Sequence, residues 1–256
     1  MTDASLEVAR RRLGDDVVHS GVFTDFDGTL SAIVDDPAAA VAQPGAVAAL
    51  EALVGRVGRV GVLSGRPVEF LRSRLPSTLV LVGLYGLELV IDGQRHDHPS
   101  GGVWRDVIDD VASQAAARGP EGMRVEAKGL SLTLHYRGRP GIGPAVRAWA
   151  EQQAARSGLE LRPARMSYEL HPPIQVDKGT TLVELADGLS SVCFLGDDVG
   201  DLPAFDGLDR LAVTGVATLR VAVRSTEGSP ELIDRADLVV DGPAGAVALL
   251  EALARG

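Results

Sequence analysis

Short runs of apolar residues alternate along this chain with segments rich in alanine and leucine. The runs GVFTDFD (21–27) and RVGVLS (59–64) predict buried strands, and the segment between them, PGAVAALEALVGRVG (44–58), predicts a helix that begins near Pro44. The run LVLVGLYGLELVIDGQ (79–94) predicts a strand, a glycine-marked turn and a hairpin arm. This alternation is typical of an α/β fold with a mainly parallel sheet.

The pattern changes from about residue 99. Two helical segments (101–119 and 141–158) are each followed by a pair of alternating strands, at 123–129 and 130–138 and then at 159–163 and 166–172. Such an αββαββ order predicts a small antiparallel sheet covered by two helices. The α/β alternation resumes after Pro172 and Pro173, so we expect residues 99–172 to form an α+β domain inserted into a fold made of 1–98 and 173–256.

Composition narrows the possible functions. The 256 residues include 45% apolar residues, enough for a sizeable core, and the net charge of −10 argues against a general binder of nucleic acid or anionic membranes. No apolar run approaches the roughly 20 residues of a membrane span, and the polar opening lacks a signal-peptide core, so we expect a cytoplasmic protein. Cys193 is the only cysteine, which excludes an intramolecular disulfide or a cysteine-based zinc site, and we expect it to be buried.

Polar residues gather where the predicted elements of the α/β part begin or end. DFDGT (25–29) and SGR (64–66) follow the first two strands, KG (178–179) opens the helix after the insertion, and GDDVGD (196–201) follows a later apolar run. Ligand sites of open α/β sheets lie beyond the carboxyl ends of the strands, so these segments are candidates for one site.

The side chains in these segments suit phosphoryl chemistry. Asp25, Asp27 and Asp197 can offer the hard oxygen ligands that Mg²⁺ prefers. Ser64, Lys178 and the backbone N–H groups after Asp27 can hold a phosphoryl group. Asp25 could attack the phosphorus, while Asp27 could protonate the leaving oxygen and then activate water.

The segments DFDGTL, LSGR, Lys178-Gly179 and GDDVGD resemble, in this order, the four motifs of the haloacid dehalogenase (HAD) superfamily. Within it the chain resembles the trehalose-6-phosphate phosphatases, since VEAKGLSLTLHYRG (125–138) and YELHPPIQVDKG (168–179) are similar to stretches of that family's cap domain. The resemblance implies a Rossmann-like HAD core with a parallel sheet and an inserted cap domain. It also implies Mg²⁺-dependent hydrolysis of trehalose 6-phosphate through an aspartyl-phosphate, with no nucleic acid or membrane as partner, and we expect a monomer.

The resemblance also implies a role for each site residue. Asp25 would be the nucleophile and a metal ligand, and Asp27 the acid and base, binding metal through its backbone carbonyl. The other implied metal ligands, direct or through water, are Asp197, Asp198 and Asp201. The implied phosphate-binding residues are Gly28, Thr29, Ser64, Gly65, Arg66 and Lys178. The implied substrate-binding residues are Tyr85, Glu88, Glu126, Lys128, Arg137 and Glu169.

Three departures from the family pattern bear mainly on the substrate. Tyr85 stands where a histidine is usual, His171 replaces an arginine, and Gly200-Asp201-Leu202 replaces Thr-Asp-Glu. Alternatives therefore stay open: the same chemistry on another sugar or pseudo-disaccharide phosphate, a phosphoryl-transferring mutase, or a non-catalytic regulatory protein that binds a sugar phosphate.

Several of these residues also have a purely structural interpretation. Asp198 and Asp201 suit the capping of a following helix. Glu126, Lys128 and Arg137 suit the solvated face of a half-exposed sheet. Tyr85 suits either stacking on a sugar or filling a domain junction.

Overall fold

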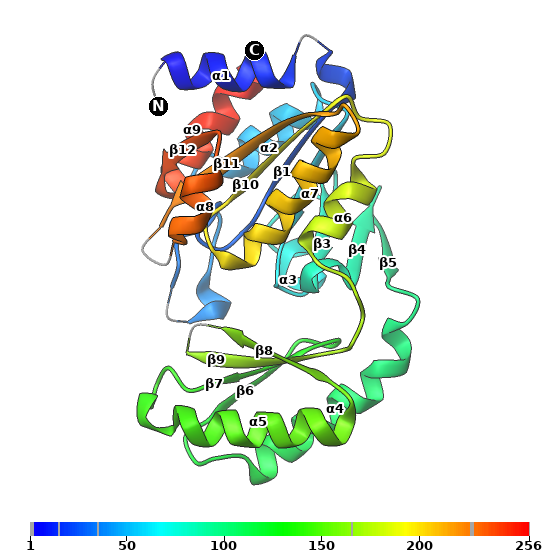
Figure 1. Cartoon of the computed structure of the whole chain (residues 1–256), viewed down its shortest axis with the longest axis vertical. Coiled ribbons are helices and arrows are strands. Elements are labelled where there is room, and N and C mark those ends of the chain that lie inside the picture. Colours follow the sequence, from blue (N-terminus) through cyan, green and yellow to red (C-terminus); the bar gives the residue numbers. More distant parts are fainter. Residues whose placement is uncertain (1–2, 15, 35, 165, 226–227, 256) are drawn as a thin grey trace. The chain divides into compact units, whose positions relative to one another are not determined.

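The computed structural model describes residues 3–14, 16–34, 36–164, 166–225 and 228–255. The chain divides into two compact units, a larger unit of Met1–His96 with Val176–Gly256 and a smaller unit of Asp97–Gln175 (Figure 1). No helix in the described ranges is long and apolar enough to cross a membrane.

A mainly parallel sheet forms the middle of the larger unit. Its described strands are β1 (Ser20–Thr24), β2 (Arg59–Leu63), β3 (Val80–Gly83), β4 (Glu88–Ile91), β5 (Gln94–Asp97), β10 (Ser191–Gly196), β11 (Ala217–Arg224) and β12 (Leu238–Asp241). Their order is β12-β11-β10-β1-β2-β3-β4-β5, with parallel pairing from β12 to β3 and antiparallel pairing of β3 with β4. The carboxyl ends of β10, β1 and β2 therefore lie side by side, although β10 comes more than 100 residues after β2.

Helices cover both faces of this sheet, which explains why its strands are apolar without alternation. The α-helices of the larger unit are α1 (Asp3–Leu13), α2 (Ala46–Val54), α3 (Val68–Arg72), α6 (Lys178–Leu185), α7 (Leu202–Val213), α8 (Pro230–Arg235) and α9 (Gly242–Arg255), and its 3-10 helices are η1 (Val17–His19), η2 (Pro37–Ala39), η3 (Leu84–Gly86) and η5 (Val199–Asp201). Val22 packs in the core shared with α1, α2, α3 and α9, whereas its neighbour Phe23 packs in the core shared with α6, α7 and α8. Cys193 is buried, as expected, and burial raises the pKa of its thiol.

The smaller unit has the expected αββαββ order. It contains α4 (Gly101–Arg118), β6 (Arg124–Ala127), β7 (Leu132–His135), η4 (Pro140–Ile142), α5 (Gly143–Ser157), β8 (Glu160–Ala164) and β9 (Ser167–His171). Its strands form an antiparallel sheet in the order β6-β7-β9-β8. Leu132, Leu134 and Leu170 on one face of this sheet pack with Ile108 of α4 and Val146 of α5.

Two elements differ from the sequence prediction. The helix expected over 44–58 is shorter, because Gly45, with φ +89°, precedes its first turn and Gly55 follows its last residue. The polar opening of the chain forms α1, which the sequence did not lead us to expect. This helix buries Ala9 and Leu13 in the core and presents Arg10, Arg11 and Arg12 in its last turn.

Candidate active site

The ends of three adjacent strands bring the predicted catalytic residues to one edge of the sheet. Asp25 follows β1, Ser64 follows β2 and Asp197 follows β10. The ladder continues into these loops, because the Asp25 N–H donates to the carbonyl of Leu195 at 2.8 Å and the Ser64 N–H donates to that of Val82 at 2.9 Å. The backbone positions at this edge are therefore set by the sheet itself.

Lys178 joins two of the acids inside the protein. Its Nζ donates to Asp25 Oδ1 at 2.7 Å and to Asp201 Oδ1 at 2.6 Å, and all three side chains are buried. The other carboxylate oxygen of Asp201 accepts from the N–H groups of Asp197, at 2.8 Å, and Asp198, at 3.3 Å. Asp201 thus links the backbone of the loop after β10 to the ammonium group of Lys178.

The start of α6 sets the position of Lys178. Asp177 caps the helix, since its carboxylate accepts from the Thr180 N–H while the Thr180 hydroxyl accepts from the Asp177 N–H. Gly179 lets α6 approach α7, because a Cβ there would lie 1.9 Å from the carbonyl oxygen of Pro203. Lys178 is therefore held by the cap on one side and by helix packing on the other.

Asp25, Asp197 and Asp201 form a buried carboxylate cluster, with ligand oxygens within 4.8 Å of one another. Burial raises the pKa of Asp25 well above its usual range, with Lys178 opposing and the neighbouring carboxylates adding to the shift. Burial, followed by repulsion from Asp201, raises the pKa of Asp197 to about 8. Burial alone would lower the pKa of Lys178, but Asp201 and Asp25 raise it well above its ordinary value.

The cluster fits a divalent cation. Two of the three buried carboxylates contact the ammonium of Lys178, so with all three ionised the cluster carries more negative than positive charge among the described residues. A hard cation with oxygen ligands would offset that excess. Asp198 is not part of the cluster: its side chain accepts from the Gly200 N–H at 2.8 Å and caps η5.

Gly28 and Thr29 pack directly against Asp197. The Thr29 hydroxyl donates to Asp197 Oδ1 at 3.3 Å. Gly28 has φ +80°, and a Cβ there would lie 2.1 Å from Asp197 Oδ2. Glycine is thus required at position 28 both by the left-handed backbone and by the closeness of the carboxylate.

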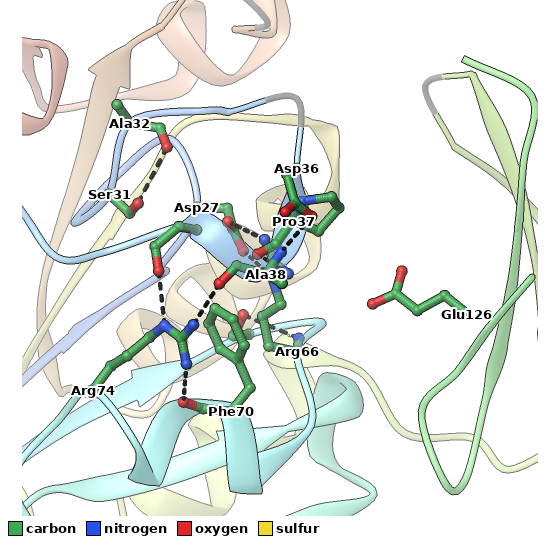
Figure 2. Close-up of polar contacts among 12 residues, drawn as sticks. Asp27, Ser31, Ala32, Asp36, Pro37, Ala38, Arg66, Phe70, Arg74 and Glu126 are labelled. Carbon is green, nitrogen blue, oxygen red and sulfur yellow. Dashed lines mark hydrogen bonds and ion pairs between the residues drawn. The ribbon is translucent and has the colours of Figure 1, made fainter. Parts of the chain in front are cut away.

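Asp27 forms an ion pair with Arg66 (Figure 2). Nε and Nη2 of Arg66 each donate to one carboxylate oxygen of Asp27 at 2.7 Å, and Nη1 donates to the carbonyl of Pro37 at 2.8 Å. The Arg66 guanidinium also lies 4.4 Å from the ring centre of Phe70. In this arrangement Arg66 holds Asp27 and the loop at Pro37. The family resemblance placed Arg66 among the phosphate-binding residues, as a support for their loop.

Tyr85 lies against the loop after β2. A Cβ on Gly65 would be 2.6 Å from the Tyr85 hydroxyl, and the Tyr85 N–H donates to the carbonyl of Ser64 at 3.0 Å. Tyr85 and the preceding Leu84 have φ of +61° and +49°, a costly backbone for residues with side chains. Tyr85 is thereby held beside the predicted phosphate loop.

Glu88 accepts a hydrogen bond from the backbone at the start of α3. Its buried carboxylate accepts from the Val68 N–H at 2.8 Å and from Arg95 Nη2 at 2.7 Å. These contacts give Glu88 a structural use within the larger unit, beside the substrate-binding role that the sequence implied.

In the smaller unit, one face of the antiparallel sheet carries a row of polar residues. Glu126 is opposite Thr133 on β7, and Thr133 is opposite Glu169 on β9. Glu126 also lies 2.7 Å from His135 Nε2. Thr133 Oγ1 and Glu169 Oε1 are buried and have no hydrogen-bond partner among the described residues, which is costly unless a ligand or water supplies one.

The structure does not bring all predicted substrate residues of the smaller unit into this row. Lys128 lies in the turn between β6 and β7, where its N–H donates to the carbonyl of Ser131, and Arg137 is exposed after β7. Sequence reasoning also missed two residues. Thr133 could have been found from the alternation of LSLTLH, and Ser225, whose hydroxyl bonds Asp197, follows the apolar run of β11.

Comparisons with known proteins give one family. The model of the trehalose-phosphatase family matches residues 23–237. The chain is 37% identical over 218 residues to the trehalose-phosphate phosphatase of Mycobacterium ulcerans, which covers 80% of the chain and 55% of that relative. It is 36% identical over 254 residues to the enzyme of the same name from Mycobacterium tuberculosis, which covers 91% of the chain and 61% of that relative. The chain thus spans less than two thirds of these relatives' length.

A solved structure with the same fold has a TM-score of 0.78. It is described as a trehalose-6-phosphate phosphatase related protein, is 24% identical, and the match covers 92% of this chain and 97% of that one. At this identity the likeness concerns the fold.

Proposed function

The chain belongs to the trehalose-phosphatase family, and we propose that it hydrolyses trehalose 6-phosphate to trehalose and phosphate. One observation carries the proposal: Lys178 is buried between Asp25 and Asp201, beside Asp197, at the carboxyl edge of the sheet. A protein that only binds a sugar phosphate has no need of this costly cluster of buried acids. We choose trehalose 6-phosphate as the substrate because two relatives are named trehalose-phosphate phosphatases.

The first step is phosphoryl transfer to Asp25. A carboxylate oxygen of Asp25 forms a bond to phosphorus, the bond from phosphorus to the sugar oxygen breaks, and that oxygen takes a proton from Asp27. Asp25 must be ionised to attack, although burial raises its pKa. Lys178, 2.7 Å from Asp25 Oδ1, favours the ionised form.

The second step releases phosphate. Asp27, now ionised, removes a proton from water while the water oxygen attacks phosphorus, and the bond from phosphorus to Asp25 breaks. The pair with Arg66 suits this ionised state of Asp27. Delivery of a proton in the first step requires a protonated Asp27 that has left this pair. Arg66 would thus position Asp27 only in its ionised state, for the second step.

Asp25, Asp197 and Asp201 would hold Mg²⁺. Asp198, whose side chain caps η5 outside this cluster, would act on the ion only through water. When bound, the ion would offset the charge of the carboxylates and of the phosphate. Ser64 and the backbone N–H groups of Gly28 and Thr29 would bind phosphate oxygens.

We assign the larger unit to the HAD core and the smaller unit to the cap, for which the sequence predicts boundaries at 99 and 172. The unpartnered oxygens of Thr133 and Glu169 support a role for the smaller unit in binding sugar hydroxyls. Glu126, Lys128 and Arg137 are its further candidates, and Tyr85 is the candidate from the larger unit. The protein would act as a cytoplasmic monomer.

Phosphate release from a panel of sugar phosphates tests the proposal. Purified protein with Mg²⁺ should give a higher kcat/KM for trehalose 6-phosphate than for glucose 6-phosphate or other disaccharide phosphates. No preference for trehalose 6-phosphate would refute the substrate. Equal turnover by wild type and Asp25→Asn would refute the nucleophile, and an isomerised product without free phosphate would indicate a mutase.

A further inference from the structure

A cavity of about 270 Å³ lies in the larger unit, far along the sheet from the acidic cluster. It is bordered by α1, η1, β1, the segment from α2 to Val57, and α9, and Figure 1 places α1 and α9 next to each other at one end of this unit. Its inner wall is apolar, with Val22, Leu53 and Leu253 all buried.

The cavity is separate from the proposed active site. It contacts Ser20 and Val22 in the first half of β1, whereas Asp25 follows the carboxyl end of that strand. Five residues of extended chain, at roughly 3.3 Å each, put about 16 Å between Ser20 and Asp25. None of the residues assigned above to metal, phosphate or sugar lines the cavity.

Two arginines line the cavity, and neither is paired with an acid in the described part of the chain. Among the described residues, Arg10 of α1 and Arg56 after α2 make no ion pair and no side-chain hydrogen bond, whereas Arg12 on the same helix pairs with Asp237 at 3.3 Å. The whole chain has a net charge of −10, whereas the described lining residues of this cavity include two arginines and no acid. A guanidinium binds a carboxylate through parallel hydrogen bonds, which makes an anion the natural complement.

The walls and the charges together define a ligand. We infer that the cavity binds a small organic carboxylate of about six to eight carbon atoms in all. The cavity volume of about 270 Å³ equals that of about nine waters at roughly 30 Å³ each. This volume limits the size of the ligand. The apolar body would contact Leu13, Leu53 and Leu253, and the carboxylate would contact Arg10 and Arg56.

Isothermal titration of the full chain with hexanoate tests this inference. Hexanoate should bind at one site, and hexan-1-ol and inorganic phosphate should each bind at least about tenfold more weakly, because one lacks the charge and the other the apolar body. Equal binding of phosphate and hexanoate, equal binding of hexan-1-ol and hexanoate, or no heat of hexanoate binding at millimolar concentrations would overturn the inference. Phosphatase activity plays no part in this test, so its outcome is independent of the proposed function.

Variants locate the site. Arg10→Gln with Arg56→Gln should weaken hexanoate binding at least about tenfold. Arg11→Gln, which removes the same charge from the same helix without touching the cavity, should leave it within about twofold. Val57→Phe, which fills the cavity, should abolish binding while circular dichroism confirms the fold. Equal binding by the double variant and Arg11→Gln, or full binding by Val57→Phe, would place the ligand elsewhere and overturn the assignment.

Discussion

Replacing Asp197 with asparagine should make the metal-free protein more stable, although it removes a proposed metal ligand. Asparagine has the same shape, so it still fits against Gly28, and its amide oxygen can accept from the Thr29 hydroxyl. It carries no charge, so the desolvation and the repulsion from Asp201 that act on Asp197 disappear. In the wild type, Asp197 would thus lower the stability of the metal-free protein while serving the site, a trade-off that is common at catalytic clusters.

The pKa of Asp197 sets the size of this effect. That pKa is about 8 in the folded protein, against about 3.9 in an unfolded chain. An acid whose pKa is raised by folding binds a proton in the folded state, so its destabilising effect is absent below about pH 4 and grows up to about pH 8. At pH 7 roughly three pH units separate the solution from the unfolded pKa, which gives a ceiling of about 4 kcal/mol. Because part of this shift is repulsion from Asp201 and Asp198, which can take up protons in place of Asp197, we expect a gain of about 2 kcal/mol.

Urea unfolding in a chelator, from pH 5 to pH 8, measures this gain. The free energy of unfolding of wild type should fall with rising pH more steeply than that of Asp197→Asn, and Mg²⁺ should stabilise wild type more than the variant. Asp198→Asn is the matched control: this carboxylate is half-buried and lies outside the cluster, and asparagine caps a helix about as well as aspartate, so the stability should change little. Lower stability of Asp197→Asn at pH 7, or parallel pH slopes, would refute the reasoning.

Three further changes test other parts of the account. Gly28→Ala should destabilise at least twice as much as Gly93→Ala in urea unfolding, since both glycines have positive φ but only position 28 would place a Cβ 2.1 Å from Asp197; equal losses would contradict this contact. Asp27→Asn should lower kcat by about 10²- to 10⁴-fold in steady-state assays, and an unchanged kcat would exclude Asp27 as acid and base. Thr133→Val should raise KM severalfold with little change in kcat or stability, because its buried hydroxyl has no described partner to lose; an unchanged KM would remove Thr133 from the sugar site.

The parts of the fold that follow from periodicity could be predicted from the sequence. β1, β2 and β10 are apolar because both their faces are covered, and parallel pairing then places Asp25, Ser64 and Asp197 at one edge. α1 escaped prediction because only a few apolar side chains, such as Leu13, secure it to the core. Its formation depends on tertiary packing, which local pattern does not reveal.

The sequence predicted which residues form the site better than it predicted which of them contact one another. Lys178 and Asp201 are separated by 23 residues, and only the packing of α6 on α7 brings them to 2.6 Å. The pair of Asp27 with Arg66 depends on the side-chain conformation of a long arginine, which no motif specifies. Ser225 was missed because a single serine after a strand is too common to signal a contact with Asp197.

Trapping the phosphorylated enzyme tests the central claim most directly. Wild-type protein would be mixed with Mg²⁺ and trehalose 6-phosphate, quenched in acid within milliseconds and reduced with borohydride, which converts an aspartyl-phosphate to homoserine. We expect mass spectrometry to find homoserine at position 25 during turnover, and none in Asp25→Asn. Modification at another residue, or none at any time while phosphate is released, would contradict Asp25 as the nucleophile.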